Sequence, residues 1–183
     1  METSIILSGF GGQGALFAGQ LLAYAAMDNG FQVTWFPSYG PEMRGGTAHC
    51  TIIISDEPIG APIVEKPDVA LVFNGPSFEK YEPLVVPNGA LIINSSICSQ
   101  KSDRTDLDQV LIPANEIAEE FGTTKMMNMA MLGAMLALRP VLSLEALVQA
   151  LFDHLPADKS HLLDSNMQVL RNGYKIGLGI QVL

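Results

Sequence analysis

A glycine-rich turn is the segment of this sequence best suited to hold a charged ligand. Residues 9–14 read GFGGQG, and Gly9, Gly11 and Gly14 have the G-x-G-x-x-G spacing of the dinucleotide-binding fingerprint. The turn follows the apolar run 4–8 and opens the Ala/Leu-rich stretch 15–27. Glycines let a phosphate approach the backbone, and the start of a helix supplies free N–H groups and partial positive charge. The pattern favours binding of an anionic group.

The acidic residue that would complete a dinucleotide site is missing. Such a site places Asp or Glu about 20 residues further on, at the end of the second strand. Here the second strand candidate, 31–36, leads into Pro37 and Ser38, while Asp28 precedes it and Glu42 lies beyond it. NAD binding is therefore disfavoured. Two interpretations stay open: a tight structural turn, or a site for an anion or a cofactor phosphate brought by a partner.

A second segment, residues 38–46 (SYGPEMRGG), places Tyr39, Glu42, Met43 and Arg44 between glycines. An Arg side chain recognises carboxylates and phosphates through two parallel hydrogen bonds, and Tyr, Met and Arg are enriched at protein interfaces. The alternative is a local ion pair between Glu42 and Arg44 that holds a surface loop and stabilises very little. We favour a recognition loop.

Asn128 stands alone in an otherwise apolar, Met-rich stretch, 126–138, that predicts a core helix. Small residues spaced four apart, such as Ala130/Ala134 and Gly133/Ala137, would let another element approach closely. A buried Asn amide needs hydrogen-bond partners. A cap at the start of the helix or a bond to the glycine turn would supply them.

The sequence contains no recognisable catalytic set, so we assign no catalytic residue and no metal ligand. Its two cysteines, Cys50 and Cys98, are too few for an iron–sulfur cluster, which takes four thiolates, or for a Cys-rich zinc site. The three histidines show no metal-ligand spacing, and Glu119 and Glu120 fit a solvated helix face.

These segments are expected to lie on a three-layer α/β/α fold with a mostly parallel or mixed sheet and a helical C-terminal third. Short apolar runs bounded by turn residues predict buried strands. The strand candidates are 4–8, 31–36, 47–55, 69–73, 90–93 and 110–113. The helix candidates are 15–27, a short helix capped by Asn115 and running to Phe121, 126–138, a helix capped by Ser143 and running to His154, and 158–175. We find no repeat and no linker, and expect one domain, 1–183.

Composition excludes several classes of protein. Ten Lys+Arg against 19 Asp+Glu give a net charge of −9, which disfavours a nucleic-acid binder. The longest apolar run is too short for a membrane span, no signal peptide is evident, and two cysteines suit a reducing cytoplasm. Only 16% of the residues are charged. Either uncharged polar residues cover the surface, or a partner covers part of it.

Three motifs in order, GFGGQG, YGPEMRGG and NMAMLGA, resemble the gamma subunit of 2-oxoacid:ferredoxin oxidoreductases, a module also found as a domain of single-chain pyruvate:ferredoxin oxidoreductases. The resemblance covers nearly the whole chain and looks closer to the 2-oxoglutarate and branched-chain 2-oxoacid (ketoisovalerate) members than to pyruvate ones. It implies cofactor-binding or site-enclosing roles for the residues that match the motifs. These are Gly11, Gly12, Gln13, Gly14, Tyr39, Gly40, Pro41, Glu42, Arg44, Gly45 and Asn128.

The resemblance implies a reaction that this chain does not perform alone. A 2-oxoacid is oxidatively decarboxylated on thiamine diphosphate, the acyl group leaves on coenzyme A, and iron–sulfur clusters pass two electrons to ferredoxin. Thiamine diphosphate, Mg²⁺ and the clusters are expected on partner subunits, and the isolated chain is expected to be inactive and to self-associate. The alternative is a stand-alone α/β protein that binds a dinucleotide or an anion at Gly9–Gly14.

Overall fold

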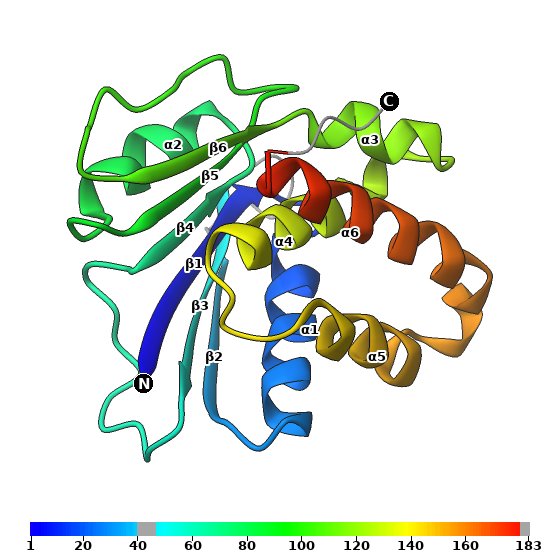
Figure 1. The fold of residues 1–183 in the computed structure, drawn as a ribbon, viewed down its shortest axis with the longest axis horizontal. Helices are drawn as coiled ribbons and strands as arrows, with labels where there is room; N and C mark the ends of the chain where they lie inside the picture. Colours follow the sequence, from blue (N-terminus) through cyan, green and yellow to red (C-terminus); the bar gives the residue numbers. More distant parts are fainter. Residues whose placement is uncertain (40–46, 180–183) are drawn as a thin grey trace.

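The computed structural model describes residues 1–39 and 47–179, apart from the side chain of Tyr39, and its described part is built on a six-stranded mixed sheet of order β2-β3-β1-β4-β5-β6 (Figure 1). The strands are β1 (Glu2–Phe10), β2 (Gln32–Tyr39), β3 (Thr47–Ser55), β4 (Val69–Val72), β5 (Ala90–Asn94) and β6 (Asp108–Ile112). The helices are α1 (Ala15–Asp28), α2 (Gly75–Tyr81), α3 (Ala114–Glu120), α4 (Met127–Leu138), α5 (Leu144–His154) and α6 (Leu163–Gly177), with 3₁₀ turns at Glu82–Leu84, Thr124–Met126 and Ala157–Leu162.

Strand direction follows the expectation of a mixed sheet. Strands β1, β4, β5 and β6 are parallel, and all residues of β4 and β5 are buried, as in a sheet covered on both faces. Strand β3 runs antiparallel between β1 and β2. It moves the end of β2 one strand spacing, about 4.8 Å, further from the glycine turn than in a parallel strand–helix–strand unit. This displacement also weighs against a dinucleotide site.

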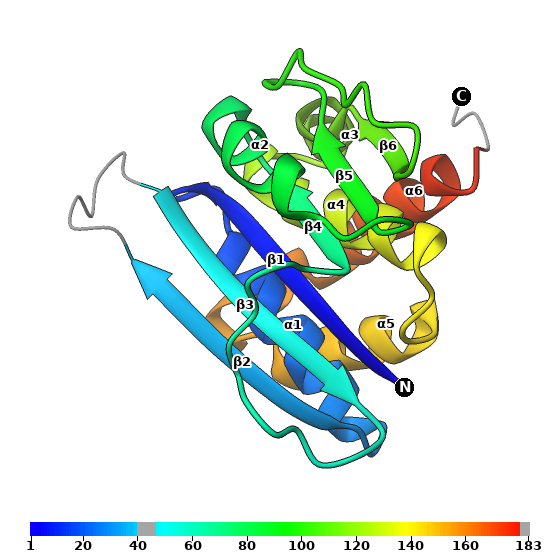
Figure 2. The same cartoon turned by 90° about the vertical axis from the view of Figure 1, so that its left-hand side faces the viewer.

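The two faces of the sheet are covered unequally. Helices α1, α3, α4, α5 and α6 lie on one face, where Ile5, Leu7, Ile52 and Leu71 belong to the larger buried cluster (Figure 1). Helix α2 covers β1, β4 and β5 on the other face, over Ile6 and a smaller cluster. Among the described helices, none lies over the outer face of β2 and β3, as Figure 2 shows. Helices on both faces of one sheet agree with the expected α/β/α layers.

Helix α4 is the most deeply buried helix of the C-terminal third. It packs against α6 through glycines on both helices, as its small residues predicted. A Cβ on Gly133 would overlap the carbonyl oxygen of Leu170, and one on Gly173 would overlap that of Ala130. The two backbones therefore touch directly. This contact fixes the position of α4, which begins one residue before Asn128.

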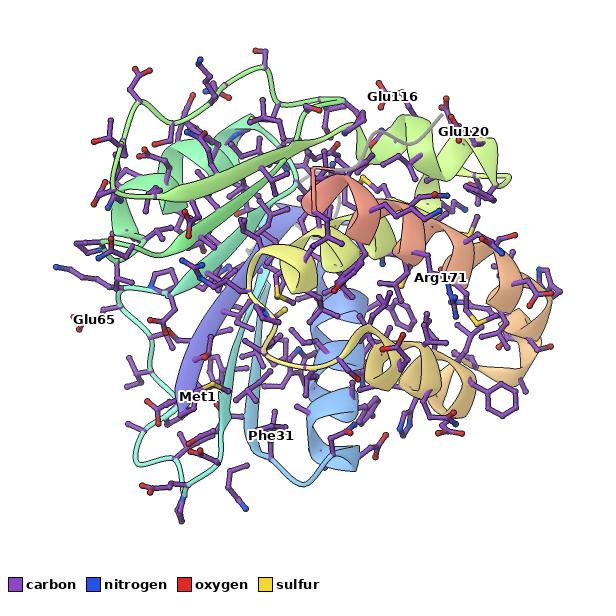
Figure 3. All side chains as sticks on the ribbon, in the orientation of Figure 1. Met1, Phe31, Glu65, Glu116, Glu120 and Arg171 are labelled. Atoms are coloured by element: carbon purple, nitrogen blue, oxygen red, sulfur yellow. The ribbon has the colours of Figure 1, made fainter. Side chains whose placement is uncertain are left out.

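Two expectations about helices were wrong or incomplete. Helix α3 begins after Pro113, and Asn115 does not cap it, because its side-chain oxygen instead accepts a hydrogen bond from Asn94. Helix α2 was not predicted, since its seven residues carry no apolar period. Glu119 and Glu120 are exposed as expected, and Figure 3 shows the side chain of Glu120 on the outer side of α3.

None of the helices within residues 1–39 and 47–179 combines the length and the apolar character that crossing a membrane requires.

Candidate functional site

The carboxyl ends of the parallel strands bring the candidate residues to one edge of the sheet. Strand β1 ends at Phe10 and leads into the glycine turn, and the segment after β4 leads into Asn74. Ligand sites of open α/β sheets lie at this edge. The last backbone pair of β1 with β3, Phe10 with Thr47, and that of β2 with β3, Tyr39 with Ala48, lie at the same edge. The turn and both flanks of segment 40–46 therefore meet there.

The glycine turn is tightly closed. The backbone N–H of Gln13 donates to the carbonyl oxygen of Phe10 (3.1 Å), while Gly12 and Gly14 have φ of 96° and 77°. Such positive angles favour glycine. A Cβ on Gly12 would meet no atom of the described residues within 4 Å. The next residue, Ala15, starts α1.

Gln13 connects the turn to the neighbouring strand. Its Oε1 accepts hydrogen bonds from the backbone N–H of Phe10 (2.6 Å) and from Nδ2 of Asn74 (3.0 Å). Asn74 is buried and caps α2, because its Oδ1 accepts from the backbone N–H of Ser77 (2.9 Å). The Oγ atoms of Ser8 and Ser77 lie 2.9 Å apart in a buried hydrogen bond that joins β1 to α2. The turn is thus held from the β4–α2 side.

Asn128 holds the turn from the opposite side. Its Nδ2 donates to the carbonyl oxygen of Gly14 (3.1 Å), so it bonds to the glycine turn and does not cap α4. The side chain is only 4% exposed, and its Oδ1 is one of two buried side-chain polar atoms without a partner in the described part of the chain. A buried amide with one free acceptor is costly, and its position is set by the contact between α4 and α6.

Two buried asparagines at this edge, Asn74 and Asn94, were not among the predicted site residues. Asn94 ends β5, and its Nδ2 donates to Oδ1 of Asn115 (3.0 Å) and to Sδ of Met127 (3.2 Å). Each of these asparagines ends a buried apolar strand or follows it within two residues, which places it at the carboxyl edge. That position is the sequence signal that would have identified both.

The remaining predicted residues fall on the second motif. The side chain of Tyr39 and the residues Gly40, Pro41, Glu42, Arg44 and Gly45 lie outside the described residues. Their predicted roles in recognition remain predictions. Within the described residues, Gly11, Gly12, Gln13, Gly14 and Asn128 come together at one place.

The titratable group closest to this edge on β3 is His49, whose backbone pairs with that of Ser8. Its ring lies 5.8 Å from that of Tyr81. Burial lowers the pKa of His49 below its ordinary value, and the charge of Lys80 lowers it further. Burial raises the pKa of the Cys50 thiol to about 12, which keeps it protonated. Both groups are therefore uncharged at neutral pH.

The described part of this edge is suited to binding and positioning. It presents backbone N–H groups and side-chain amides, and among residues 1–39 and 47–179 no three His, Cys, Asp or Glu side chains are grouped to hold a metal ion. Hollows lined by described residues also lie away from this edge. One of about 350 Å³ lies at the amino ends of β1 and β4 beside Arg139, and one of about 200 Å³ is lined by residues of α1, among them Phe17, and by His154 of α5.

Comparison with known proteins relates this geometry to a family. The ketoisovalerate oxidoreductase subunit VorA of Methanothermobacter marburgensis is 37% identical over 172 residues, covering 94% of this chain and 36% of the relative. The 2-oxoglutarate synthase subunit KorC of Methanocaldococcus jannaschii is 34% identical, covering 96% of this chain and 94% of the relative. The chain therefore spans about a third of VorA and nearly all of KorC.

The fold of a solved structure matches that of this chain over its full length. The gamma subunit of keto/oxoacid ferredoxin oxidoreductase from Geobacter sulfurreducens superimposes with a TM-score of 0.86 at 28% identity, covering 100% of this chain and 99% of that one. Residues 4–176 match the family described as pyruvate ferredoxin/flavodoxin oxidoreductase. The chain belongs to the pyruvate ferredoxin/flavodoxin oxidoreductase family.

Proposed function

We propose that this chain is the gamma-type subunit of a complex that oxidatively decarboxylates a 2-oxoacid to an acyl-coenzyme A and passes two electrons to ferredoxin. The observation that carries the proposal is the full-length similarity, in sequence and in fold, to a gamma subunit of such an enzyme. Relatives that act on ketoisovalerate, 2-oxoglutarate and pyruvate, by their names, support the class of substrate.

The cofactors belong, in this proposal, to partner subunits. Thiamine diphosphate with Mg²⁺ supplies the decarboxylation chemistry, iron–sulfur clusters carry the electrons, and coenzyme A accepts the acyl group. Both cysteines of this chain are buried free thiols, and two thiolates are fewer than the four that a cluster takes. Free thiols also support a reducing, cytoplasmic location.

The role we propose for this chain is to enclose and position, with no catalytic residue of its own. Gly11, Gly12, Gln13 and Gly14 form a turn that is held on two sides by buried amides. Free backbone N–H groups at the start of α1 suit an anionic group such as a phosphate of coenzyme A. We propose that Asn128 and the motif 39–45 belong to the same site.

Co-purification with assay tests the proposal. The tagged chain, produced in its native host, is expected to bring down subunits that contain thiamine diphosphate and iron–sulfur clusters. The complex should reduce ferredoxin in the presence of coenzyme A and one of 2-oxoglutarate, ketoisovalerate or pyruvate. Deleting the gene should abolish this activity, and re-adding the purified chain should restore it. Full activity in the deletion strain would refute the proposal.

A further inference from the structure

The orientation of the Gln13 amide decides what this turn can recognise. A glutamine side chain has an acceptor end, Oε1, and a donor end, Nε2, and hydrogen-bond partners determine which end faces which way. Gln13 is partly exposed and is the one residue of the turn 11–14 with a polar side chain. Its orientation can be followed from the buried side, where each partner has a fixed hydrogen-bonding role.

The chain of hydrogen bonds begins at α2. The backbone N–H of Ser77 can only donate, so the atom of Asn74 that faces it must be Oδ1. The other end of this amide, Nδ2, is then directed to Gln13. Because Asn74 is only 2% exposed, it has no free space in which to turn over without losing both bonds.

The same logic orients Gln13. The backbone N–H of Phe10 and Nδ2 of Asn74 are both donors, and both lie on Oε1 of Gln13. Nε2 has no acceptor among residues 1–39 and 47–179, and it is not one of the buried side-chain polar atoms left without a partner there. Within the described residues, Nε2 is therefore the end of the amide that makes no hydrogen bond.

Packing holds the side chain of Gln13 in this orientation. A Cβ on Gly9 would lie 2.6 Å from Oε1 of Gln13 and 2.9 Å from Cβ of Phe73. The missing side chain at position 9 makes the slot in which the Gln13 carboxamide rests against the end of β4. Reversing the amide would place its NH₂ group against the N–H of Phe10 and the NH₂ of Asn74, an arrangement with no acceptor.

We propose that Asn74 is a positioning residue that fixes Gln13 with its NH₂ group free, so that the turn recognises an oxygen acceptor: a carboxylate, phosphate or carbonyl oxygen. The inference rests on the proposed function and names the chemistry that this site accepts. The oxygen comes either from a small-molecule substrate, the 2-oxoacid or coenzyme A, or from the surface of a partner subunit. Among the described residues, no atom lies within 4 Å of a Cβ added at Gly12.

Two substitutions separate positioning from recognition. Asn74→Ser keeps an oxygen that caps α2 but removes the donor to Gln13. Gln13→Glu keeps an acceptor for Phe10 and Asn74 but replaces the free donor with a charged acceptor. Asn166→Ser is the matched control, because Asn166 is also buried and bonds only to Leu162 in the described part of the chain, away from the turn.

The isolated full-length chain tests the positioning step. We expect Asn74→Ser to shift the NMR signals of the Gln13 side-chain NH₂ and to speed hydrogen exchange at the Phe10 amide about fivefold, as for one lost hydrogen bond. Gln13→Glu should keep the protection of Phe10. Unchanged exchange and unchanged Gln13 signals in Asn74→Ser would overturn the positioning role.

The reconstituted complex tests the recognition step. If the oxygen belongs to a substrate, both variants should raise KM for that substrate about three- to tenfold, more than they lower kcat. If the oxygen belongs to a partner subunit, the KM values for the 2-oxoacid and for coenzyme A should be unchanged. The affinity for that subunit should then fall by a similar factor. Gln13→Glu matching the control in KM and assembly would overturn the inference. A wild-type chain that restores no activity would instead contradict the proposed function.

Discussion

Replacing Gly14 by alanine probes the contact between the glycine turn and α4. The backbone at Gly14 has φ of 77°, and a Cβ there would lie 2.5 Å from Nδ2 of Asn128. Gly12 is the matched position, because its φ is 96° and an added Cβ would meet no atom of residues 1–39 and 47–179 within 4 Å. Both substitutions carry the backbone cost, and only one of them displaces a neighbour.

The cost of the left-handed backbone can be separated from the cost of displacing Asn128. A left-handed backbone costs an alanine about 1–2 kcal/mol, which is the whole expected loss for Gly12→Ala. In Gly14→Ala the amide of Asn128 must also leave its bond to the carbonyl oxygen of Gly14 while staying buried, which adds about 1–3 kcal/mol. For a chain of this size, each kcal/mol shifts the midpoint of thermal unfolding by about 2–4 °C. The thermal midpoints of Gly12→Ala and Gly14→Ala should therefore differ by several degrees.

A double-mutant cycle measured by urea unfolding isolates the contact. In an Asn128→Ala background, Gly14→Ala should cost no more than Gly12→Ala, and the coupling energy between the two positions should be about 1–3 kcal/mol. Equal losses for the two glycines, with the cycle additive to within about 0.5 kcal/mol, would refute the reasoning that Asn128 holds the turn.

Three further outcomes are expected. Gly133→Ala should lower the free energy of unfolding by about 3 kcal/mol or more, because the added methyl group overlaps the backbone of α6. Gly60→Ala is the control, since no described atom lies within 4 Å of its added methyl group. Equal urea midpoints for the two variants would contradict the direct contact between the backbones of α4 and α6. Cys50 and Cys98 are buried with raised pKa values, so Ellman's reagent should label neither until the chain unfolds; rapid labelling of the folded chain would disprove this. Folding lowers the pKa of His49, so the unfolded chain binds a proton at this residue more tightly than the folded chain does. The free energy of unfolding should therefore fall as pH drops below about 6.5. A His49→Gln variant with the same pH dependence of stability would count against this.

Elements whose residues are locally consistent were predictable. The β-branched run 47–55 is β3 (Thr47–Ser55) with the same bounds, and Ser143 caps α5 through a bond to the backbone N–H of Ala146 (3.0 Å), as its position before an apolar stretch predicted. Helix α2 was missed because it is short, lacks an apolar period and depends on Asn74 for its cap. Its stability comes from packing, which a local pattern does not contain.

The sequence pattern did not predict the order of the strands in the sheet. A continuous apolar run indicates a buried strand and carries no sign of direction. Strand β3 contributes Cys50, Ile52 and Ile54 to the larger buried cluster, and it lies antiparallel between β1 and β2. The expectation of a mostly parallel or mixed sheet was confirmed, but the place of the reversed strand came from tertiary pairing.

The candidate site divides in the same way. By itself the sequence determined the glycine spacing of the turn, the helix after it and the single polar residue in the Met-rich helix, because backbone freedom and helical period are properties of neighbouring residues. Only the tertiary structure decided that Asn128 bonds to Gly14, 114 residues away, and that Gln13 bonds to Asn74, 61 residues away. Hydrogen bonds between side chains of distant segments depend on how strands and helices pack, and that packing sets which end of the Gln13 amide bonds to Phe10 and Asn74.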